Sequence, residues 1–264
     1  MPNGLAASPD LFELRGSTGM SLMRHAGKLR SLVPQPARER MYEWHPGRAR
    51  RWRRFPGLER IEPSGHAILT FDDGPDSDAT RAVLEALDGA GARATFFLLG
   101  SQLAAHPDLG AEVVRRGHEI GLHGYEHHRH DRIDYDLSRS DLLAGLAAIE
   151  DTLGIRCRWY RPPYGKMSPA NVEVCESVGM TPVYWSAWGL DWEDVSSQRI
   201  ADVVSEQVDD GGIILLHDSA RFARRRSAVP TADAISLIAR RAQDRGISLV
   251  SLGDAVSGRE QVAA

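Results

Sequence analysis

Two pairs of residues have the types and spacing that could bind and use a metal ion. Asp72 and Asp73 are adjacent, and His123 and His127 are four residues apart, a spacing at which both imidazoles can face one point from a helical turn. Two imidazoles and one carboxylate form a three-ligand metal site that leaves room for water and substrate. Adjacent carboxylates cannot easily share one task, so we expect one to bind the metal and the other to stay free as a base.

These residues stand where predicted strands end. After residue 65, segments of helical spacing alternate with seven apolar runs, which are His66–Phe71, Ala94–Leu99, His118–Leu122, Cys157–Arg161, Pro182–Ser186, Gly212–His217 and Ile247–Leu252. The polar or aromatic residues at or after the ends of these runs are Asp72, Asp73, His123, His127, Arg161, Asp191, Trp192 and His217. Because the carboxyl ends of parallel strands share one face of an α/β fold, we expect these side chains to converge.

The alternation also predicts the fold class. Helical stripes such as Val83, Ala86, Leu87 and Ala90 separate the runs, and glycines such as Gly91 stand where helices should stop. Repeated strand–helix units indicate a parallel sheet. Seven units favour a distorted (β/α)7 barrel related to the TIM barrel, and an open doubly wound sheet is the alternative.

Charge separates the beginning of the chain from the rest. Residues 1–60 hold 12 Lys and Arg against 5 Asp and Glu, although the whole chain has a net charge of −4. We therefore predict two parts, a basic and partly helical N-terminal extension over 1–65 and a catalytic α/β domain over 66–264.

The extension contains a predicted amphipathic helix over 21–33 and an arginine cluster over 48–54. Together, residues 21–54 are candidates for peripheral membrane contact. We favour the alternative that this helix packs on the outside of the barrel, since amphipathic helices usually cover a core. Nucleic-acid binding is not expected, because the basic segment has no recognisable reading motif.

The bulk composition favours a cytoplasmic location. No stretch approaches 18 consecutive apolar residues, so a membrane-spanning helix is not expected. The first residues lack the basic start and apolar run of a secretory signal. The two cysteines, Cys157 and Cys175, are expected to be buried thiols.

Five short segments occur in the order and spacing of a known family. They are Thr70-Phe-Asp-Asp-Gly-Pro75, His123-x3-His127, Arg161-Pro-Pro-Tyr-Gly165, Asp191-Trp192 and Leu215-Leu-His217. They resemble the motifs of the polysaccharide deacetylase family, the NodB homology domain of carbohydrate esterase family 4. The resemblance covers about residues 66–252. It implies a distorted barrel of about seven β/α units, in agreement with the strand count.

The resemblance implies hydrolysis of the N-acetyl group of a sugar substrate, with a divalent metal that is usually zinc. Asp73, His123 and His127 would bind the metal. Asp72 would be the general base, and Arg161 would hold its orientation and keep it ionised.

His217 would be the general acid that protonates the departing amine, and Asp191 would favour its charged form. The backbone N–H of Tyr164 would help to stabilise the oxyanion. Trp192 and Leu215 would line the small pocket for the acetyl methyl group. Cobalt, nickel and ferrous iron also suit two histidines and one carboxylate.

Each residue alone has an ordinary explanation, such as a surface ion pair for Arg161, a helix N-cap for Asp191 or core packing for Tyr164 and Trp192. These explanations do not account for five motifs in one order. Two other functions stay open: hydrolysis of another carbon–nitrogen amide bond or an O-acetyl ester, and non-catalytic sugar binding.

Three features lie beside the motifs. Gly124 stands where the family often has a serine or threonine whose hydroxyl braces the metal loop, so the rigidity of this loop is in question. His128 and His130 are expected to be exposed loop residues. The aromatic cluster of Trp185, Trp188 and Trp192 suits either sugar stacking or barrel packing.

Overall fold

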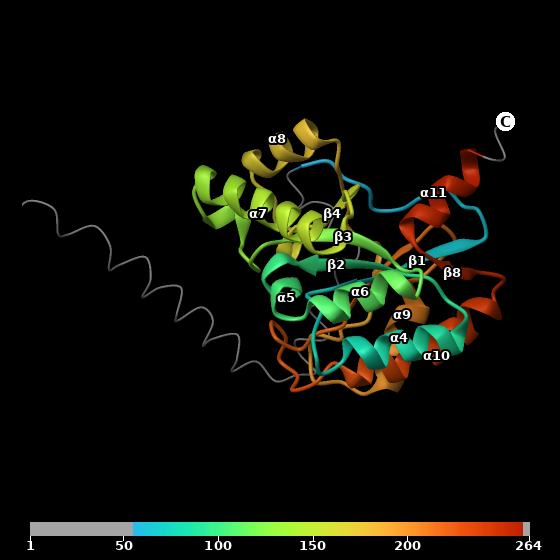
Figure 1. Cartoon of the computed structure of the whole chain (residues 1–264). Coiled ribbons are helices and arrows are strands. Elements are labelled where there is room, and N and C mark those ends of the chain that lie inside the picture. Colours follow the sequence, from blue (N-terminus) through green and yellow to red (C-terminus); the bar gives the residue numbers. More distant parts are fainter. Residues whose placement is uncertain (1–54, 261–264) are drawn as a thin grey trace, which may run out of the picture. The chain divides into compact units, whose positions relative to one another are not determined.

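The computed structural model describes residues 55–260 (Figure 1), so the predicted membrane-contacting residues 21–54 lie outside the described part. The strands are β1 (His66–Asp72), β2 (Thr95–Leu99), β3 (Glu119–Gly124), β4 (Trp159–Tyr160), β5 (Thr181–Pro182), β6 (Ala187–Trp188), β7 (Ile213–His217) and β8 (Ser248–Val250). The α-helices are α4 (Thr80–Ala90), α5 (Gly100–Ala105), α6 (Pro107–Arg115), α7 (Tyr135–Leu153), α8 (Pro169–Val178), α9 (Ser197–Gln207), α10 (Val229–Gln243) and α11 (Leu252–Glu260). Short 3₁₀ turns η1 (His130–Arg132) and η2 (Pro163–Gly165) complete the described part.

The strands form one sheet in which every pair is parallel. Their order is β5-β4-β3-β2-β1-β7-β6, and β8 pairs with the first half of β1. Helices connect successive strands, as parallel pairing requires, except between β5 and β6. The predicted distorted α/β barrel is therefore confirmed, with β1 near the centre of the sheet.

Side chains that alternate between the two faces of the strands contribute to two separate hydrophobic cores, a larger one outside the sheet and a smaller, inner one inside the barrel. Leu69 and Phe71 of β1 point outward into the larger core, where α4, α9 and α10 pack on the sheet. Ile68 points inward and belongs to a smaller core with Phe97 of β2 and Ile213 of β7. Because side chains alternate with a period of two, every second side chain of β1 counted from Ile68 points inward, and we call these side chains the inward series of the strand. The inward series of β1 ends at Asp72, the last residue of the strand.

The prediction of one strand over Pro182–Ser186 was wrong. The chain instead forms β5, which ends at Pro182, and β6, which begins just after the run, at opposite ends of the sheet order. Val183 leaves β5 to form a parallel bridge with Leu58, and its N–H still donates to the carbonyl of Tyr160. The apolar run therefore crosses between the two edges of the sheet.

The segment before β1 lies along this crossing. Leu58 pairs with Val183 beyond β5, and Arg60 pairs with Gly212 just before β7. Ile61 is buried in the inner core. The last part of the predicted extension thus pairs with the chain just after β5 and just before β7.

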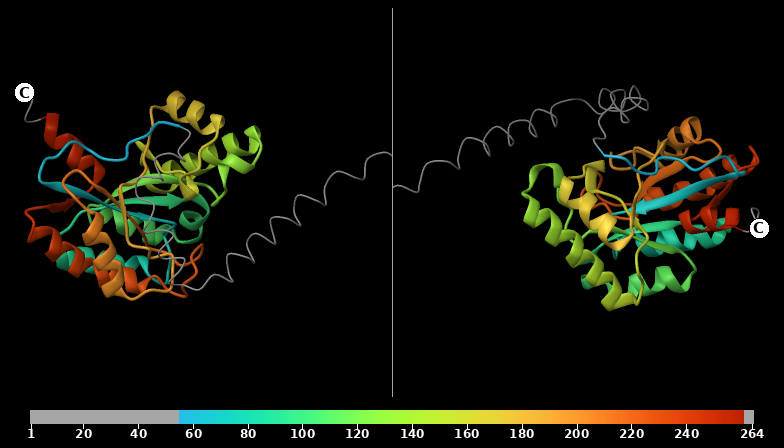
Figure 2. Two further views of the ribbon diagram at one scale, coloured as in Figure 1. Left: turned by 180° about the vertical axis from the view of Figure 1, so that it is seen from behind. Right: turned by 90° about the horizontal axis from the view of Figure 1, so that it is seen from above.

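The end of the barrel where β1 begins is closed by α11, as the turned views show (Figure 2). Glu119, the first residue of β3, accepts hydrogen bonds from the Trp159 indole at 2.7 Å and from the Gly253 N–H at 2.8 Å. Thr95 Oγ1 accepts from the Leu252 N–H at 2.9 Å. These contacts satisfy N–H groups in the first turn of α11, which have no partner within the helix.

The helices pack on the outer face of the sheet. α10 lies between α4 and α9, and α7 lies between α5 and α8 (Figure 1). Cys157 and Cys175 are buried free thiols, as predicted. Among the helices of residues 55–260, none has both the length and the apolar character needed to span a membrane.

Candidate active site

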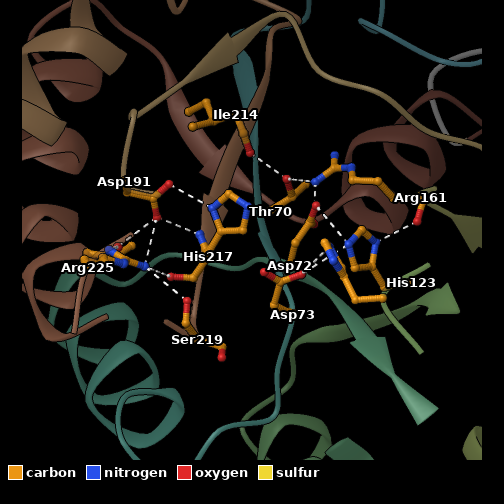
Figure 3. A network of polar contacts seen from close by, with 12 residues as sticks. Thr70, Asp72, Asp73, His123, Arg161, Asp191, Ile214, His217, Ser219 and Arg225 are labelled. Atoms are coloured by element: carbon orange, nitrogen blue, oxygen red, sulfur yellow. Dashed lines mark hydrogen bonds and ion pairs between the residues drawn. The ribbon is translucent and has the colours of Figure 1, made fainter. Parts of the chain in front are cut away.

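Four of the predicted site residues face the inside of the barrel at the ends of its strands (Figure 3). Asp72 ends β1, His123 lies in β3, Arg161 follows β4 and His217 ends β7. Each continues the inward series of its strand, and Asp72 and His217 are register partners in neighbouring strands. Opposite this end, α11 closes the barrel.

A cluster of three residues has the geometry of a metal site. Asp73 Oδ1 lies 3.3 Å from Nε2 of His123 and 3.3 Å from Nε2 of His127. One ligand atom from each of the three residues lies within 4.8 Å of the other two. Asp73 has a positive φ of 79°, uncommon for a residue other than glycine, and this turn separates its side chain from that of Asp72.

The sequence predicted that the two histidines share a helical turn, but the structure shows that they do not. His123 belongs to β3 and His127 to the loop after it. Gly124 between them has a φ of 111°, a conformation that side chains rarely allow. The chain therefore turns at Gly124, and this turn brings the second imidazole beside the first.

The protonation of the cluster suits a cation. The carbonyl of Arg161 can only accept, so the 2.6 Å contact with His123 Nδ1 places the proton on Nδ1 and leaves Nε2 free to bind a metal. Burial lowers the pKa of His127 to about 4, so this ring is neutral at pH 7. Burial opposes ionisation of Asp73, but the His123 and His127 imidazoles that face its carboxylate outweigh burial and hold the pKa of Asp73 below its usual range.

Asp73 Oδ1 is buried and has no hydrogen-bond partner. An anionic oxygen in that situation is costly unless a cation or donor compensates it. A divalent metal at Asp73, His123 and His127 would provide that compensation, so the residues fit the metal that the family resemblance implies.

Asp72 is held beside the cluster by Arg161. The guanidinium Nη1 donates to Asp72 Oδ1 at 2.8 Å and to Thr70 Oγ1 at 2.6 Å, and Nη2 donates to the Tyr184 carbonyl at 2.9 Å. Arg161 is fully buried and lies over the ring of Phe97. Asp72 Oδ2, which is not the oxygen bonded to Arg161, lies 3.9 Å from His123 Nε2 and faces the cluster.

His217 is held on the other side of the site by Asp191. The carboxylate accepts from His217 Nδ1 at 2.9 Å and from the His217 backbone N–H at 2.8 Å. Burial favours the neutral ring, but the charge and hydrogen bond of Asp191 outweigh it and raise the pKa of His217 to about 9. Thr231 Oγ1 donates to Asp191 at 2.8 Å, and buried Arg225 contacts the same oxygen.

Leu215 and Trp192, predicted to line the methyl pocket, and Tyr164, predicted to stabilise the oxyanion, lie near His217 or His127. Leu215 lies two residues before His217 on the inward series of β7. The Trp192 ring packs edge-on against His217 with 5.9 Å between centroids. Tyr164 has a φ of 58°, and its ring lies 4.5 Å from that of His127.

Several residues of the site were not predicted from the sequence. Phe222 stacks on His127 with centroids 4.2 Å apart, and it is exposed, as Tyr164 is. Asp218 is buried and accepts from Thr80 Oγ1 at 2.6 Å, and burial raises its pKa to about 7. A Cβ on Gly74 would lie 2.1 Å from Asp218, so only glycine fits there. The position of Asp218 directly after His217 was a signal for this contact, whereas Phe222 carries none.

The tryptophan cluster separates into two environments. Trp188 is buried in β6, and Trp185 packs on both cores. Of the three rings, that of Trp192 contacts His217. His130, expected to be exposed, is fully buried because its ring hydrogen-bonds Ser138 on α7.

Comparison with known proteins identifies the family. A sequence model of polysaccharide deacetylases matches residues 60–183. A chitooligosaccharide deacetylase of Azorhizobium caulinodans is 33% identical over 199 residues, which cover 70% of this chain and 91% of that protein. The chain belongs to the polysaccharide deacetylase family.

Two further relatives support this membership. A peptidoglycan-N-acetylmuramic acid deacetylase of Bacillus subtilis, PdaC, is 31% identical over 208 residues, which cover 78% of this chain and 42% of that protein. The chain thus spans less than half of that relative. The crystal structure of the Bc1960 peptidoglycan N-acetylglucosamine deacetylase superposes with a TM-score of 0.69 at 26% identity, covering 75% of this chain and 90% of that one.

Proposed function

We propose that this polysaccharide deacetylase homologue removes the acetyl group from N-acetylated sugar units by metal-dependent hydrolysis. The observation that carries the proposal is the placement of two buried pairs on either side of one ligand cluster. Asp72 with Arg161 stands beside Asp73, His123 and His127, and His217 with Asp191 stands across from them (Figure 3).

Asp72 is the base of the proposed reaction. A divalent ion at the cluster would polarise the acetamide carbonyl and lower the pKa of water nearby. Asp72 Oδ2 faces the cluster and takes a proton from the attacking water, while Oδ1 stays bonded to Arg161. Arg161 restrains rotation of the carboxylate through this bond.

His217 is the acid. Its pKa of about 9 keeps the ring protonated at pH 7, so it can give a proton to the departing amine. Protonation is needed because an amide anion is a very poor leaving group. Asp191 engages Nδ1, which leaves the proton on Nε2 for transfer.

The remaining predicted residues would bind the acetamide. The Tyr164 N–H would donate to the developing oxyanion. Leu215 and Trp192 would contact the methyl group, and they lie on the His217 side of the site. Exposed Tyr164 and Phe222 flank His127, and their rings offer apolar faces to neighbouring sugar units.

The substrate class follows from what the relatives share. Their names specify N-acetylmuramic acid, N-acetylglucosamine and chitooligosaccharide, all of which carry an acetamide on a pyranose ring. We propose a glycan or glycoside of this type as the substrate. Zinc is the metal we expect, and metal analysis of the purified protein would distinguish it from cobalt, nickel and iron.

Acetate release tests the function. The purified protein loaded with Zn²⁺ should release acetate from chitooligomers or peptidoglycan fragments, and a chelator should abolish the release. Asp72→Asn should bind Zn²⁺ as the parent does but lose about 10²- to 10⁴-fold in rate. An Asp72→Asn protein with full activity would exclude Asp72 as the base.

The same assay separates the alternatives. Release of acetate from O-acetyl esters but not from N-acetyl sugars would support the esterase function. Sugar binding with no hydrolysis of any substrate would support a non-catalytic protein. The cytoplasmic location, the membrane contact of residues 21–54 and the division at residues 65 and 66 stay predictions, which cell fractionation, liposome binding and limited proteolysis would test.

A further inference from the structure

Asp141 is a buried carboxylate outside the proposed catalytic set. It lies on the buried face of α7, at a position of the helical stripe where an apolar side chain would be usual, and it is 6% exposed. Burial raises its pKa above the ordinary range. A carboxylate in such a place needs hydrogen bonds that compensate its lost hydration.

Those hydrogen bonds come from the metal loop. Asp141 Oδ1 accepts from the Glu126 N–H at 2.9 Å, and Oδ2 accepts from the Tyr125 N–H at 3.1 Å. Both amides lie between His123 and His127. One carboxylate on a helix thus holds two of the four peptide units that connect the histidine ligands, through charge-assisted bonds of the stronger kind.

Two glycines make this contact possible. A Cβ on Gly124 would lie 2.8 Å from Asp141 Oδ2 and 3.0 Å from the Glu126 carbonyl. A Cβ on Gly145, one turn further along α7, would lie 2.9 Å from the carbonyl carbon of Gly124. The helix backbone can therefore approach the loop, and the carboxylate occupies the space that a side chain at residue 124 would need.

The surroundings of Asp141 keep it in place. His130 Nε2 lies 3.6 Å from Oδ2, and burial lowers the pKa of His130 to about 4, so this ring is neutral at pH 7. The other nitrogen of His130 contacts Ser138 Oγ at 3.0 Å, and Ser138 contacts Ser168 Oγ at 2.6 Å. The chain just after the loop is thereby also fastened to α7, through His130 and Ser138.

We propose that Asp141 is a positioning residue that holds the loop between His123 and His127 in its metal-binding conformation and does the work of the hydroxyl absent at Gly124. The proposal rests on the metal binding of the proposed function but not on its substrate. Removal of groups that orient metal ligands typically costs 10- to 100-fold in metal affinity. This range sets the expected effect.

The test measures the affinity of the full-length protein for Zn²⁺ alone, by competition with a chromogenic chelator. Asp141→Ala should bind Zn²⁺ about 100-fold more weakly and Asp141→Asn about 10-fold more weakly. Asp141→Glu, which keeps the charge, should bind more tightly than Asp141→Ala. The matched control is Asp136→Asn, an exposed carboxylate on the same helix, which should leave the affinity unchanged.

Amide hydrogen exchange of the metal-free proteins gives a second measurement that does not depend on catalysis. In Asp141→Ala, the N–H groups of Tyr125 and Glu126 should lose protection while those of the neighbouring strand β2 keep theirs. Affinity within twofold of the parent, or unchanged protection of both amides, would overturn the proposal.

Gly124 supplies the reciprocal variant. Gly124→Ala and Asp141→Ala should each weaken Zn²⁺ binding, and the double variant should lose less than the product of the two losses, because both disrupt one contact. Independent effects would count against the proposal. If the parent binds Zn²⁺ and these results hold but no acetate is released from any glycan, the proposed function fails while the role of Asp141 stands.

Discussion

Asp191 sets the protonation of His217, because it accepts both the ring Nδ1–H and the backbone N–H of that residue. The carboxylate raises the pKa of His217, so the acid form persists through neutral pH and is lost only as the pH rises towards 9. Asp191→Asn removes the charge that raises this pKa. We therefore expect the alkaline limb of the kcat/KM profile to move to lower pH and the rate at pH 8 to fall about 10²-fold.

The measurement is a pH–rate profile of both proteins between pH 5 and 10 with one N-acetylated substrate. Thr231→Val is a useful comparison, since it removes one hydrogen bond to Asp191 but keeps the charge. Because Thr231→Val keeps the charge of Asp191, its alkaline limb should not move to lower pH. An alkaline limb that stays in place in Asp191→Asn would show that His217 is not the group titrating there.

Phe222 combines exposure with a stacked contact on His127, a proposed metal ligand. If its free face contacts a sugar ring, Phe222→Ala should raise KM by roughly fivefold, equivalent to ~1 kcal/mol for an aromatic contact, with a smaller effect on kcat. Steady-state kinetics with chitooligomers of two lengths would measure this. Leu137→Ala, an exposed apolar residue at the start of α7, is the control. A fall in Zn²⁺ affinity with KM unchanged would assign Phe222 to the orientation of His127 alone.

At the scale of elements, the segment before β1 is part of the structure of the barrel. Ile61 fills the inner core between the edges that end in β5 and β6. Ile61→Ala should lower the free energy of unfolding by about 2–4 kcal/mol, because it leaves a cavity in that core. Urea unfolding followed by circular dichroism would measure the change, with exposed Ser64→Ala as the control. A loss below ~0.5 kcal/mol would mean that the segment is not firmly packed.

Much of this arrangement can be predicted from local patterns. Strand ends and motif order place Asp72, His123 and His217 at one end of a parallel sheet, since the inward series of a strand follows from its period of two. The path of Pro182–Ser186 cannot be predicted in this way, because its bridge to Leu58 depends on a segment far away in the sequence. The expectation of a helical turn for His123 and His127 was wrong for a similar reason, because the conformation of this loop also depends on a segment far away in the sequence.

Asp141 shows most clearly what local sequence patterns cannot predict. Helical periodicity puts it on the buried face of α7, but the pattern does not reveal which backbone amides a buried carboxylate will meet. The contact made by Phe222 could not be predicted either, because this residue lies in a loop with no periodic pattern. Positions on regular elements were therefore predictable, whereas contacts between a loop and a distant element were not.

For the molecule as a whole, the metal site joins three points of the chain that are separate in the unfolded state. A ligand that binds only the native state stabilises it by about 2.7 kcal/mol at 100 times its Kd. Zn²⁺ should therefore raise the Tm of the protein, and a chelator should reverse the rise. Thermal melts with and without Zn²⁺ would measure this, and Asp73→Ala should abolish the shift. Equal melting temperatures for the parent would indicate that the cluster holds no metal.

The central position of β1 has a consequence for how the protein is made. Its partner on one side, β2, follows closely in the chain, whereas its partner on the other side, β7, is among the last strands to be synthesised. Asp73, His123 and His127 all belong to the early half, and His217 arrives with the late strand. Pairings distant in sequence form slowly. A growing chain would therefore be able to bind its metal well before His217, the proposed general acid, is synthesised. Hydrolysis would become possible only in the last third of translation.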